Sequence, residues 1–586
     1  MYPILQKVDS PADIKKLAID ELNLLAVDIR EALFNRLTKI GGHCGPNFGS
    51  VEAEIALHFV FNSPQDKFVF DVSHQSYAHK MITGRKLGYI DDSKFQEDSG
   101  YTNPEESEHD LFNVGHTSTS ISLATGLAKA RDLAHKKENV IAFIGDGSLS
   151  GGEALEALNY AGSELNSNFI IIVNDNEMCI AENHGGIYKN LKELRDSRGK
   201  CEKNFFKALG FDYYYEENGN DIASLIKIFS RVKDVNHPVV VHIHTLKGKG
   251  YKPAETDKEA WHWCAPFDRE TGKSTVDWGN GESYESLTTN YLLEKAKQDP
   301  KLLVITPAMP ASVGLYPEAR KSLGSQYTDV GIAEEQAIAM ASGAAKYGAK
   351  PVVVTNATFL QRSYDQMAQD TAINNNAIAV ILNYSGFQIL RDVTHLGIFI
   401  NSIYSNIPNV RVLAPTNKAE YLAMISYAID QNDHPTIVLM PGNGVIDDGR
   451  MADKNYSEVK FKTEIAGEKV ALIALGDFYQ LGENFVQEIQ KKLGFTPTLI
   501  NPRFASDIDT ETLDKLKENH KLVITLEDGI VEGGFGVKVA NYLSDSDLKV
   551  KVLGFEKKFF DRYNPDEFLK DQGITAENIL ELCSKI

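Results

Sequence analysis

The sequence of 586 residues predicts an α/β fold in which helices cover both faces of largely parallel sheets. Short, nearly continuous Val, Ile and Leu runs alternate with helical patterns along the whole chain, and strands buried on both faces have this composition. The runs expected to form strands are 139–144, 168–173, 237–244, 301–306, 350–355, 377–382, 470–475 and 521–526. The length exceeds the roughly 250–300 residues that one core supports, so we expect two or three domains.

Two polar segments that are poor in strand-like runs suggest where the domains meet. They cover 268–294 and 444–460. Composition shifts of this kind are typical of connections between compact units. We therefore expect three domains, at 1–295, 296–455 and 456–586.

The amino-acid composition limits which binding partners and which cellular compartment the protein can have. The chain has 61 basic and 81 acidic residues and a net charge of -20, which argues against nucleic acid or an anionic membrane. The five cysteines include no CxxC pair, which favours a reducing compartment. We find no signal-peptide pattern and no apolar run near the roughly 20 residues of a membrane span, so we expect a cytoplasmic protein. His242 and His244 share a strand face, but we expect no structural zinc.

An acid between two glycines follows the first of two neighbouring strands. The run 139–144 leads into Gly145-Asp146-Gly147, a helix is expected at 153–165, and the run 168–173 leads into a segment containing Asn176. A strand–helix–strand crossover makes the strands parallel, so both ends meet at the sheet edge where ligands bind. Carboxylate and amide oxygens suit Mg²⁺, and the glycines allow a diphosphate to approach. Simple turns would explain the same residues about equally well.

Further stretches give the pattern a family resemblance. The Gly-Asp-Gly and Asn-Asp-Asn segments look like the thiamine diphosphate motif. The other matching stretches are 41–61, 71–85, 114–133, 246–255, 329–343, 358–366, 393–397 and 527–536. Together they resemble the 1-deoxy-D-xylulose-5-phosphate synthases, relatives of transketolase, in order over nearly the whole chain.

The resemblance implies three doubly wound domains of transketolase type, the third with a mixed sheet. The first domain would bind the diphosphate and Mg²⁺, the second the aminopyrimidine of thiamine diphosphate. It further implies a homodimer that takes pyruvate as donor and D-glyceraldehyde 3-phosphate as acceptor. The cofactor would supply a carbanion equivalent, which the protein orients.

The resemblance also assigns roles to residues. Asp146, Asn176 and the Met178 carbonyl would hold the metal. Residues implied to contact the cofactor are His74, Gly115, His116, Thr117, Gly145, Asp146, Gly147, Ser148, Asn176, Met178, Lys247, Glu334 and Phe359. Residues implied at the reaction centre are His43, His74, His262, His395, Glu334 and Arg362. Taken singly, Glu334 would be read as a helix-start acid, Phe359 as core, and Lys247 and Arg362 as surface charges.

Departures from the family pattern cluster on the acceptor side. In the stretch 383–395, Tyr384 stands where the family has a phosphate-binding arginine. Arg391 stands where it has an aspartate, with Asp392 one place later. Leu439 replaces a second such arginine. Tyrosine and leucine cannot replace the bidentate guanidinium. We expect Tyr384, Arg391 and Asp392 near the substrate, with Arg391 either gripping phosphate or pairing with Asp392 or a surface acid.

Three functions remain open from the sequence. The first is the synthase reaction, which the intact cofactor motifs favour. The second is the same carboligation with another aldehyde acceptor or a ketose donor, which Tyr384, Leu439 and Arg391 suggest. The third is a cofactor-binding subunit without turnover, which the retained acid Glu334 and the histidines oppose.

Overall fold

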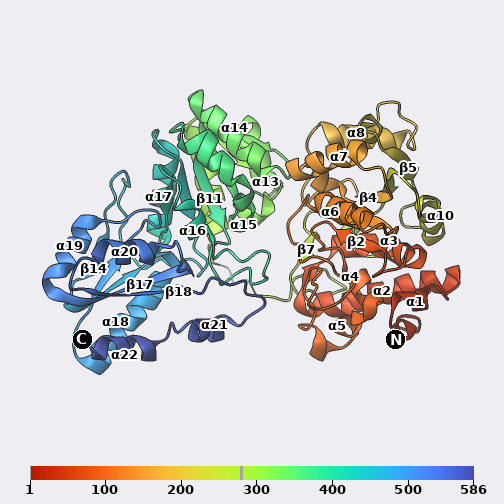
Figure 1. Ribbon diagram of the computed structural model, residues 1–586. Helices are drawn as coiled ribbons and strands as arrows, with labels where there is room; N and C mark the ends of the chain where they lie inside the picture. Colours follow the sequence, from red (N-terminus) through yellow and green to blue (C-terminus); the bar gives the residue numbers. More distant parts are fainter. Residues whose placement is uncertain (1, 278–280) are drawn as a thin grey trace. The chain divides into compact units, whose positions relative to one another are not determined.

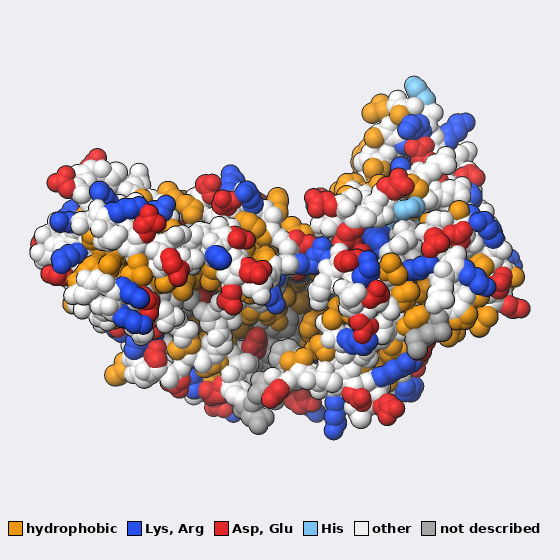
Figure 2. Space-filling view, turned by 90° about the horizontal axis from the view of Figure 1, so that it is seen from below, with side chains coloured by type: hydrophobic (Ala, Val, Ile, Leu, Met, Phe, Trp, Pro, Cys, Tyr) orange, Lys and Arg blue, Asp and Glu red, His pale blue; other side chains and the backbone are white. Residues whose placement is uncertain are grey.

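The computed structural model describes residues 2–277 and 281–586, which form two compact units. The first unit comprises the chain up to residue 280 with Gly331–Ala333, and the second comprises Gly281–Val330 and Glu334–Ile586. Each unit has its own sheets (Figure 1) and its own buried hydrophobic clusters. On the face drawn in Figure 2, acidic and basic side chains are interspersed over the surface.

The first unit is built on a five-stranded parallel sheet in the order β2-β3-β4-β6-β5. The strands are β2 (Lys67–Phe70), β3 (Val140–Gly145), β4 (Phe169–Asp175), β5 (Asp212–Glu216) and β6 (Pro238–His244). Its helices are α1 (Pro11–Ile14), α2 (Ile19–Ile40), α3 (Gly45–Val60), α4 (Tyr77–Lys80), α5 (Leu87–Ile90), α6 (Ser120–Leu133), α7 (Gly152–Glu164), α8 (Gly186–Asp196), α9 (Phe205–Ala208), α10 (Ile222–Val232) and α11 (Lys252–Thr256).

The sequence of this unit explains its central crossover. Every residue of β4 is buried, as its run of Ile and Val requires of a strand covered on both faces. Helix α7 buries Ala154, Ala157, Leu158 and Ala161, which recur at helical spacing on one face. A Cβ at Gly162 would lie 2.1 Å from the Leu209 carbonyl oxygen, so only glycine permits this close packing.

A small antiparallel pair outside the main sheet joins distant parts of the first unit. Strand β1 (Gly42–His43) pairs with β7 (Trp263–Cys264), so that His43 lies opposite Trp263. Gly41, just before β1, has a φ of +74°, and a Cβ there would lie 2.5 Å from the Cys264 carbonyl oxygen. The pairing therefore depends on glycine at this position.

The second unit contains two sheets. The first, in the order β12-β13-β11-β10-β8-β9, is entirely parallel. Its strands are β8 (Leu302–Thr306), β9 (Tyr327–Asp329), β10 (Lys350–Asn356), β11 (Ala379–Asn383), β12 (Arg411–Leu413) and β13 (Thr436–Leu439). The other, in the order β14-β16-β15-β17-β18, is mixed because β14 runs antiparallel to β16. Its strands are β14 (Lys462–Ile465), β15 (Lys469–Ala474), β16 (Thr498–Asn501), β17 (His520–Ile530) and β18 (Lys549–Phe555).

Helices pack on these sheets, and one apolar core continues between them. Buried residues of the parallel sheet, such as Val380, and of the mixed sheet, such as Ile473, belong to the same hydrophobic cluster. The helices are α12 (Tyr284–Gln298), α13 (Pro317–Leu323), α14 (Glu334–Lys346), α15 (Ala357–Leu360), α16 (Ile400–Tyr404), α17 (Lys418–Asp430), α18 (Tyr479–Leu493), α19 (Thr510–Asn519), α20 (Phe535–Leu543), α21 (Pro565–Asp571) and α22 (Ala576–Ser584).

The predicted α/β class, the parallel sheets and the mixed third sheet are confirmed. Each of the eight runs expected as strands overlaps a strand, and the expected helix 153–165 is α7. The three predicted domain ranges stay a prediction. Within the first polar segment, residues 278–280 lie outside the described residues, and α12 begins inside it. A search of the described residues for a helix long and apolar enough to cross a bilayer finds none.

Replacing Gly41 by alanine tests whether the β1–β7 pairing depends on glycine. The added Cβ would meet the Cys264 carbonyl at a backbone angle that L-residues avoid. We expect the thermal unfolding midpoint to fall by about 5 °C. The control is Gly126→Ala in α6, where a Cβ meets nothing within 4 Å and the midpoint should hold or rise. Equal midpoints for both variants would contradict the dependence.

Candidate active site

The carboxyl ends of β3 and β4 bring Asp146 and Asn176 to one edge of the first sheet, as predicted. Gly145 and Asn174 are paired across the two strands, so the residues that follow lie side by side. Asp146 is buried, and its Oδ2 accepts a hydrogen bond of 2.7 Å from Asn183 Nδ2. Burial, and then the charge of Asp175, raise the pKa of Asp146. This carboxylate would be stabilised by a cation.

Two further observations describe the same place. The Oδ1 atom of Asn176 is buried and has no hydrogen-bond partner among the described residues. Lys247 is buried, and burial lowers its pKa to about 8 while its Nζ donates to the Cys179 carbonyl at 2.6 Å. The described residues include no group of three His, Cys, Asp or Glu side chains suited to a metal. A cation here would therefore be bound by Asp146 together with amide and backbone oxygens.

The turn that carries Asn176 is held by residues on both sides of it. Asp175 accepts hydrogen bonds from Arg195 of α8 and, at 2.9 Å, from His242 Nε2 of β6. Arg195 also lies 3.4 Å from the carboxylate of Glu177. Burial opposes ionisation of Asp175, but His242 and Arg195 outweigh it and lower its pKa. Neither Asp175 nor Arg195 was expected from the sequence, although Asp175 is the central residue of the Asn-Asp-Asn segment.

Small residues bring backbone close to this edge. A Cβ at Gly147 would lie 3.0 Å from the Cys179 sulfur, and one at Gly151 only 2.1 Å from Ser118 Oγ. Ser118 follows the Gly115-His116-Thr117 segment, and Asp71 at the end of β2 accepts the Ser118 and Ser120 amides at 2.9 and 3.1 Å. Asp71 therefore fixes the segment that leads into α6. This role was not expected from the sequence, because β2 was not among the predicted strands.

Three predicted histidines form a cluster in the first unit. The ring centroids of His43 and His74 are 4.9 Å apart, those of His43 and His262 5.7 Å, and those of His74 and His262 5.2 Å. The β1–β7 pairing brings His262 next to His43, which is 219 positions away in the sequence. Burial, then the charges of Lys247 and the other two histidines, lower the pKa of His262 well below its usual value. His262 is therefore neutral at neutral pH.

The second unit gathers the other predicted groups. Glu334 begins α14 and is buried, and burial raises its pKa to about 7 against the opposing charge of Arg362. Arg362 Nη1 lies 3.6 Å from Glu334 Oε2. Phe359 and His395 meet edge to face with ring centroids 5.5 Å apart. The structure thus pairs Glu334 with Arg362, and Phe359 with His395.

Asp392 lies beside His395 and orients it. Its Oδ1 accepts from Thr394 Oγ1 at 2.6 Å and lies 3.1 Å from His395 Nδ1. Burial opposes ionisation of Asp392, yet these hydrogen bonds lower its pKa to about 2. The Asp392 carboxylate therefore contacts Thr394 and His395, while Arg391 Nη1 lies near the Tyr563 carbonyl oxygen.

The remaining acceptor-side residues lie in different environments. Arg391 is exposed and its Nη1 lies 3.5 Å from the Tyr563 carbonyl oxygen. Tyr384 follows β11 with a φ of 57°, and burial raises its pKa to about 12. Leu439, at the end of β13, is a buried core residue. Neither Tyr384 nor Leu439 carries a positive charge, so neither can bind a phosphate as an arginine does.

Comparison with known proteins places the whole chain in one family. The family model described as 1-deoxy-D-xylulose-5-phosphate synthase matches residues 5–202 and 196–245. The transketolase pyrimidine-binding domain matches 282–444, and the transketolase C-terminal domain matches 458–579.

Curated relatives match over their full lengths. A 1-deoxy-D-xylulose-5-phosphate synthase from Clostridium beijerinckii is 36% identical over 100% of this chain and 99% of its own. One from Listeria monocytogenes is 36% identical over 99% and 96%. Among solved structures, a transketolase variant from Pichia stipitis is 16% identical with a TM-score of 0.46, covering 98% of this chain and 97% of its own. The chain is a transketolase-type transferase and belongs to the 1-deoxy-D-xylulose-5-phosphate synthase family.

Proposed function

We propose that this enzyme uses thiamine diphosphate and Mg²⁺ to decarboxylate pyruvate and to transfer the two-carbon unit to D-glyceraldehyde 3-phosphate, giving 1-deoxy-D-xylulose 5-phosphate. The observation that carries the proposal is the buried Asp146 carboxylate, whose pKa is raised and which lies at the sheet edge with Asn176. The names of the curated relatives support the product, 1-deoxy-D-xylulose 5-phosphate.

The described residues fit both the metal and the diphosphate. Mg²⁺ would be held by Asp146, by the unpartnered Asn176 Oδ1 and by the Met178 carbonyl. The segment 115–117, the backbone at 145–148 and Lys247 would hold the diphosphate, since glycine lets amide groups approach it closely. The negative charges of Asp146 and of the bound diphosphate would also stabilise the buried Lys247 ammonium.

When bound, thiamine diphosphate supplies a carbanion equivalent that side chains cannot. In the second unit, Glu334 would share a proton with N1′ of the aminopyrimidine, because its pKa of about 7 lets it hold or release that proton near neutral pH. Phe359 would pack on the pyrimidine ring. Arg362, 3.6 Å from Glu334, would retain charge beside the substrate.

The histidines would handle protons at substrate oxygens. His262 is neutral at neutral pH, so one ring nitrogen donates and the other accepts. His43 and His74 lie within 5.7 Å of it, centroid to centroid. His395 is oriented by Asp392, whose Oδ1 lies 3.1 Å from its Nδ1. These groups can donate to and accept from a carboxylate, carbonyl or hydroxyl of a small substrate.

A second candidate is the same carboligation with a different aldehyde or a ketose donor. It is favoured by Leu439, which is buried in the core where the family has a phosphate-binding arginine, and by the exposed Arg391. We further propose a homodimer and the three domains 1–295, 296–455 and 456–586, each containing one main sheet.

Product analysis distinguishes the candidates. The chain is incubated with thiamine diphosphate, Mg²⁺ and pyruvate, with and without D-glyceraldehyde 3-phosphate, and carbon dioxide and 1-deoxy-D-xylulose 5-phosphate are measured. The proposal expects product only with the acceptor present. Pyruvate consumed without this product favours another acceptor, and an inert pyruvate overturns the proposed donor.

Glu334→Gln should abolish turnover and change stability in a pH-dependent way. The folded pKa of about 7 lies above the usual glutamate value of 4.5, so burial of the ionised form destabilises the apoprotein increasingly as pH rises from about 4.5 to 7. Compared with wild type, the variant should therefore unfold at a higher temperature at pH 8 and at a similar temperature at pH 4.5. A stability difference independent of pH would contradict the burial of this carboxylate.

Arg195→Met should weaken binding of the divalent cation. The change removes the group that holds Asp175 and Glu177 on either side of Asn176. Loss of such outer contacts commonly costs about 10-fold or more in metal affinity. Affinity is measured with Mn²⁺ by electron paramagnetic resonance in the presence of thiamine diphosphate. Lys192→Met on the same helix, where Lys192 pairs only on the surface with Asp196, serves as the control. Unchanged Mn²⁺ affinity in Arg195→Met would remove this role.

A further inference from the structure

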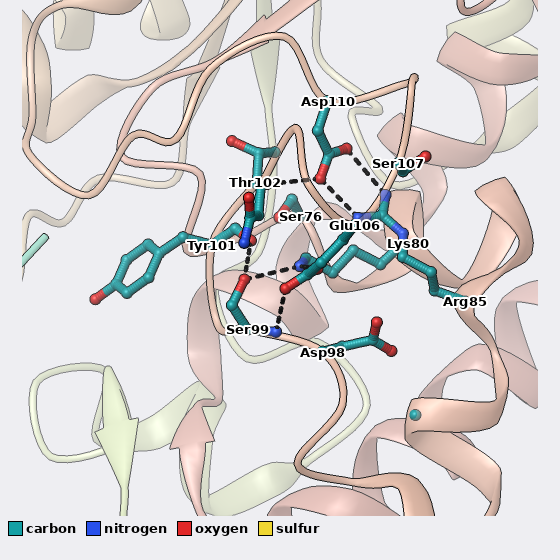
Figure 3. A network of polar contacts seen from close by, with 12 residues as sticks. Ser76, Lys80, Arg85, Asp98, Ser99, Tyr101, Thr102, Glu106, Ser107 and Asp110 are labelled. Atoms are coloured by element: carbon teal, nitrogen blue, oxygen red, sulfur yellow. Dashed lines mark hydrogen bonds and ion pairs between the residues drawn. The ribbon is translucent and has the colours of Figure 1, made fainter. Parts of the chain in front are cut away.

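A segment without helix or strand, residues 98–114, is folded by buried charges in the first unit (Figure 3). Two cations point into it from α4 and the helical turn Met81–Arg85. Lys80 Nζ lies 2.5 Å from Glu106 Oε2, and its side chain is fully buried. Arg85 forms two hydrogen bonds to Asp110, of 2.6 and 2.9 Å. The segment is therefore anchored by two opposed ion pairs.

Glu106 and Asp110 also accept hydrogen bonds from backbone amides on either side of Tyr101. Glu106 Oε1 accepts from the Ser99 amide at 2.8 Å. Asp110 Oδ2 accepts from the Asn103 amide, also at 2.8 Å. The network therefore closes a short loop from Ser99 to Asn103 with Tyr101 between its fixed ends.

Neighbouring hydrogen bonds leave this loop little freedom. Ser99 Oγ donates to the Tyr101 carbonyl at 2.7 Å. The Thr102 amide donates to Ser73 Oγ at 2.9 Å, and Thr102 Oγ1 donates to the Phe112 carbonyl at 2.8 Å. Ser73 directly precedes His74 of the histidine cluster. The loop is thus linked to the residue next to His74 through the Ser73 hydroxyl.

The Tyr101 ring points away from the ion pairs (Figure 3) and toward the histidines. Its centroid lies 5.8 Å from that of His43, with the rings at 67°. The side chain is partly exposed. A phenol can donate and accept a hydrogen bond and also offers an apolar edge, so this position suits contact with a small polar ketone or aldehyde.

Burying four charged side chains costs free energy, which indicates that this network positions the loop rather than stabilising the fold. Charges taken out of water are offset by pairing at best to near neutrality, and apolar side chains would stabilise a fold as well. Lys80 and Asp110 are fully buried at the side chain, and Arg85 and Glu106 nearly so. Both acids accept directional hydrogen bonds from the backbone around Tyr101, and apolar packing could not provide these.

We propose that Tyr101 contacts the substrate beside His43, and that Glu106 and Asp110 are positioning residues that hold it there. The inference deepens the proposed function and rests on it, because it places a further group at the same reaction centre. It assigns to segment 98–114 an influence on substrate affinity without a direct role in holding the cofactor.

Substitution at Tyr101 gives the first test. KM for pyruvate and for D-glyceraldehyde 3-phosphate are measured separately, and thiamine diphosphate affinity is measured by fluorescence quenching. Tyr101→Ala should raise at least one KM by roughly fivefold or more, and Tyr101→Phe should separate the hydroxyl from the ring. Cofactor affinity should stay within about twofold. Both KM values unchanged in Tyr101→Ala would overturn the contact.

A double-mutant cycle tests the positioning role. Glu106→Gln should raise the same KM, and in the Tyr101→Ala background it should add less than about twofold, because it acts through Tyr101. If Glu106→Gln raises KM by the same factor in wild type and in Tyr101→Ala, and lowers the unfolding midpoint, its role is purely structural. Glu105→Gln, an exposed neighbour, is the control. If Glu106→Gln does not fold, Lys80→Met with Glu106→Gln replaces it, since that pair leaves no lone buried charge.

Failure of the proposed function is visible in the wild-type chain alone. A wild type that turns over neither substrate would overturn that function and, with it, the contact assigned to Tyr101. An active wild type with an insensitive Tyr101→Ala would overturn only the present inference.

Discussion

A buried carboxylate at the end of a parallel strand is the constraint on which this site depends. Asp146 is removed from water, and a second acid, Asp175, lies close enough to raise its pKa further. Asp175 accepts hydrogen bonds from Arg195 and from His242. Asp146 accepts a hydrogen bond from the Asn183 amide and is opposed by the charge of Lys247, but these do not offset its burial and its pKa stays raised. The arrangement leaves one acid that a divalent cation would stabilise, next to the Asn176 amide oxygen, which has no hydrogen-bond partner in the described part of the chain.

The same pattern of burial and compensation appears among the predicted site residues of the second unit. Glu334 is buried with one cation 3.6 Å away, and its pKa near 7 follows from that imperfect compensation. Asp392 is fully compensated and serves His395. Fully paired acids orient neighbours, whereas incompletely paired ones are available to a ligand. The fold therefore determines which buried carboxylates are paired within the protein and which remain available to a ligand.

Much of the fold and part of the site could be predicted from the sequence. Runs such as 168–173 predict buried strands, and the crossover rule then places Asp146 near Asn176. Local patterns cannot predict that His43 meets His262, because two strands of two residues each make that pairing. Nor do they predict Arg195 on Asp175 or the loop around Tyr101, which depend on long-range side-chain contacts. The role of Arg391 was left open by its position alone, and the structure places it on the surface near the Tyr563 carbonyl.

The most direct test of this account is calorimetric titration of the apoprotein with thiamine diphosphate, once in Mg²⁺ and once in EDTA. A carboxylate edge that requires a cation to accept a diphosphate should bind the cofactor in Mg²⁺ and lose roughly 100-fold or more of that affinity in EDTA. Equal affinity in the two buffers would show that the diphosphate is held without the cation, and would contradict the role assigned to Asp146.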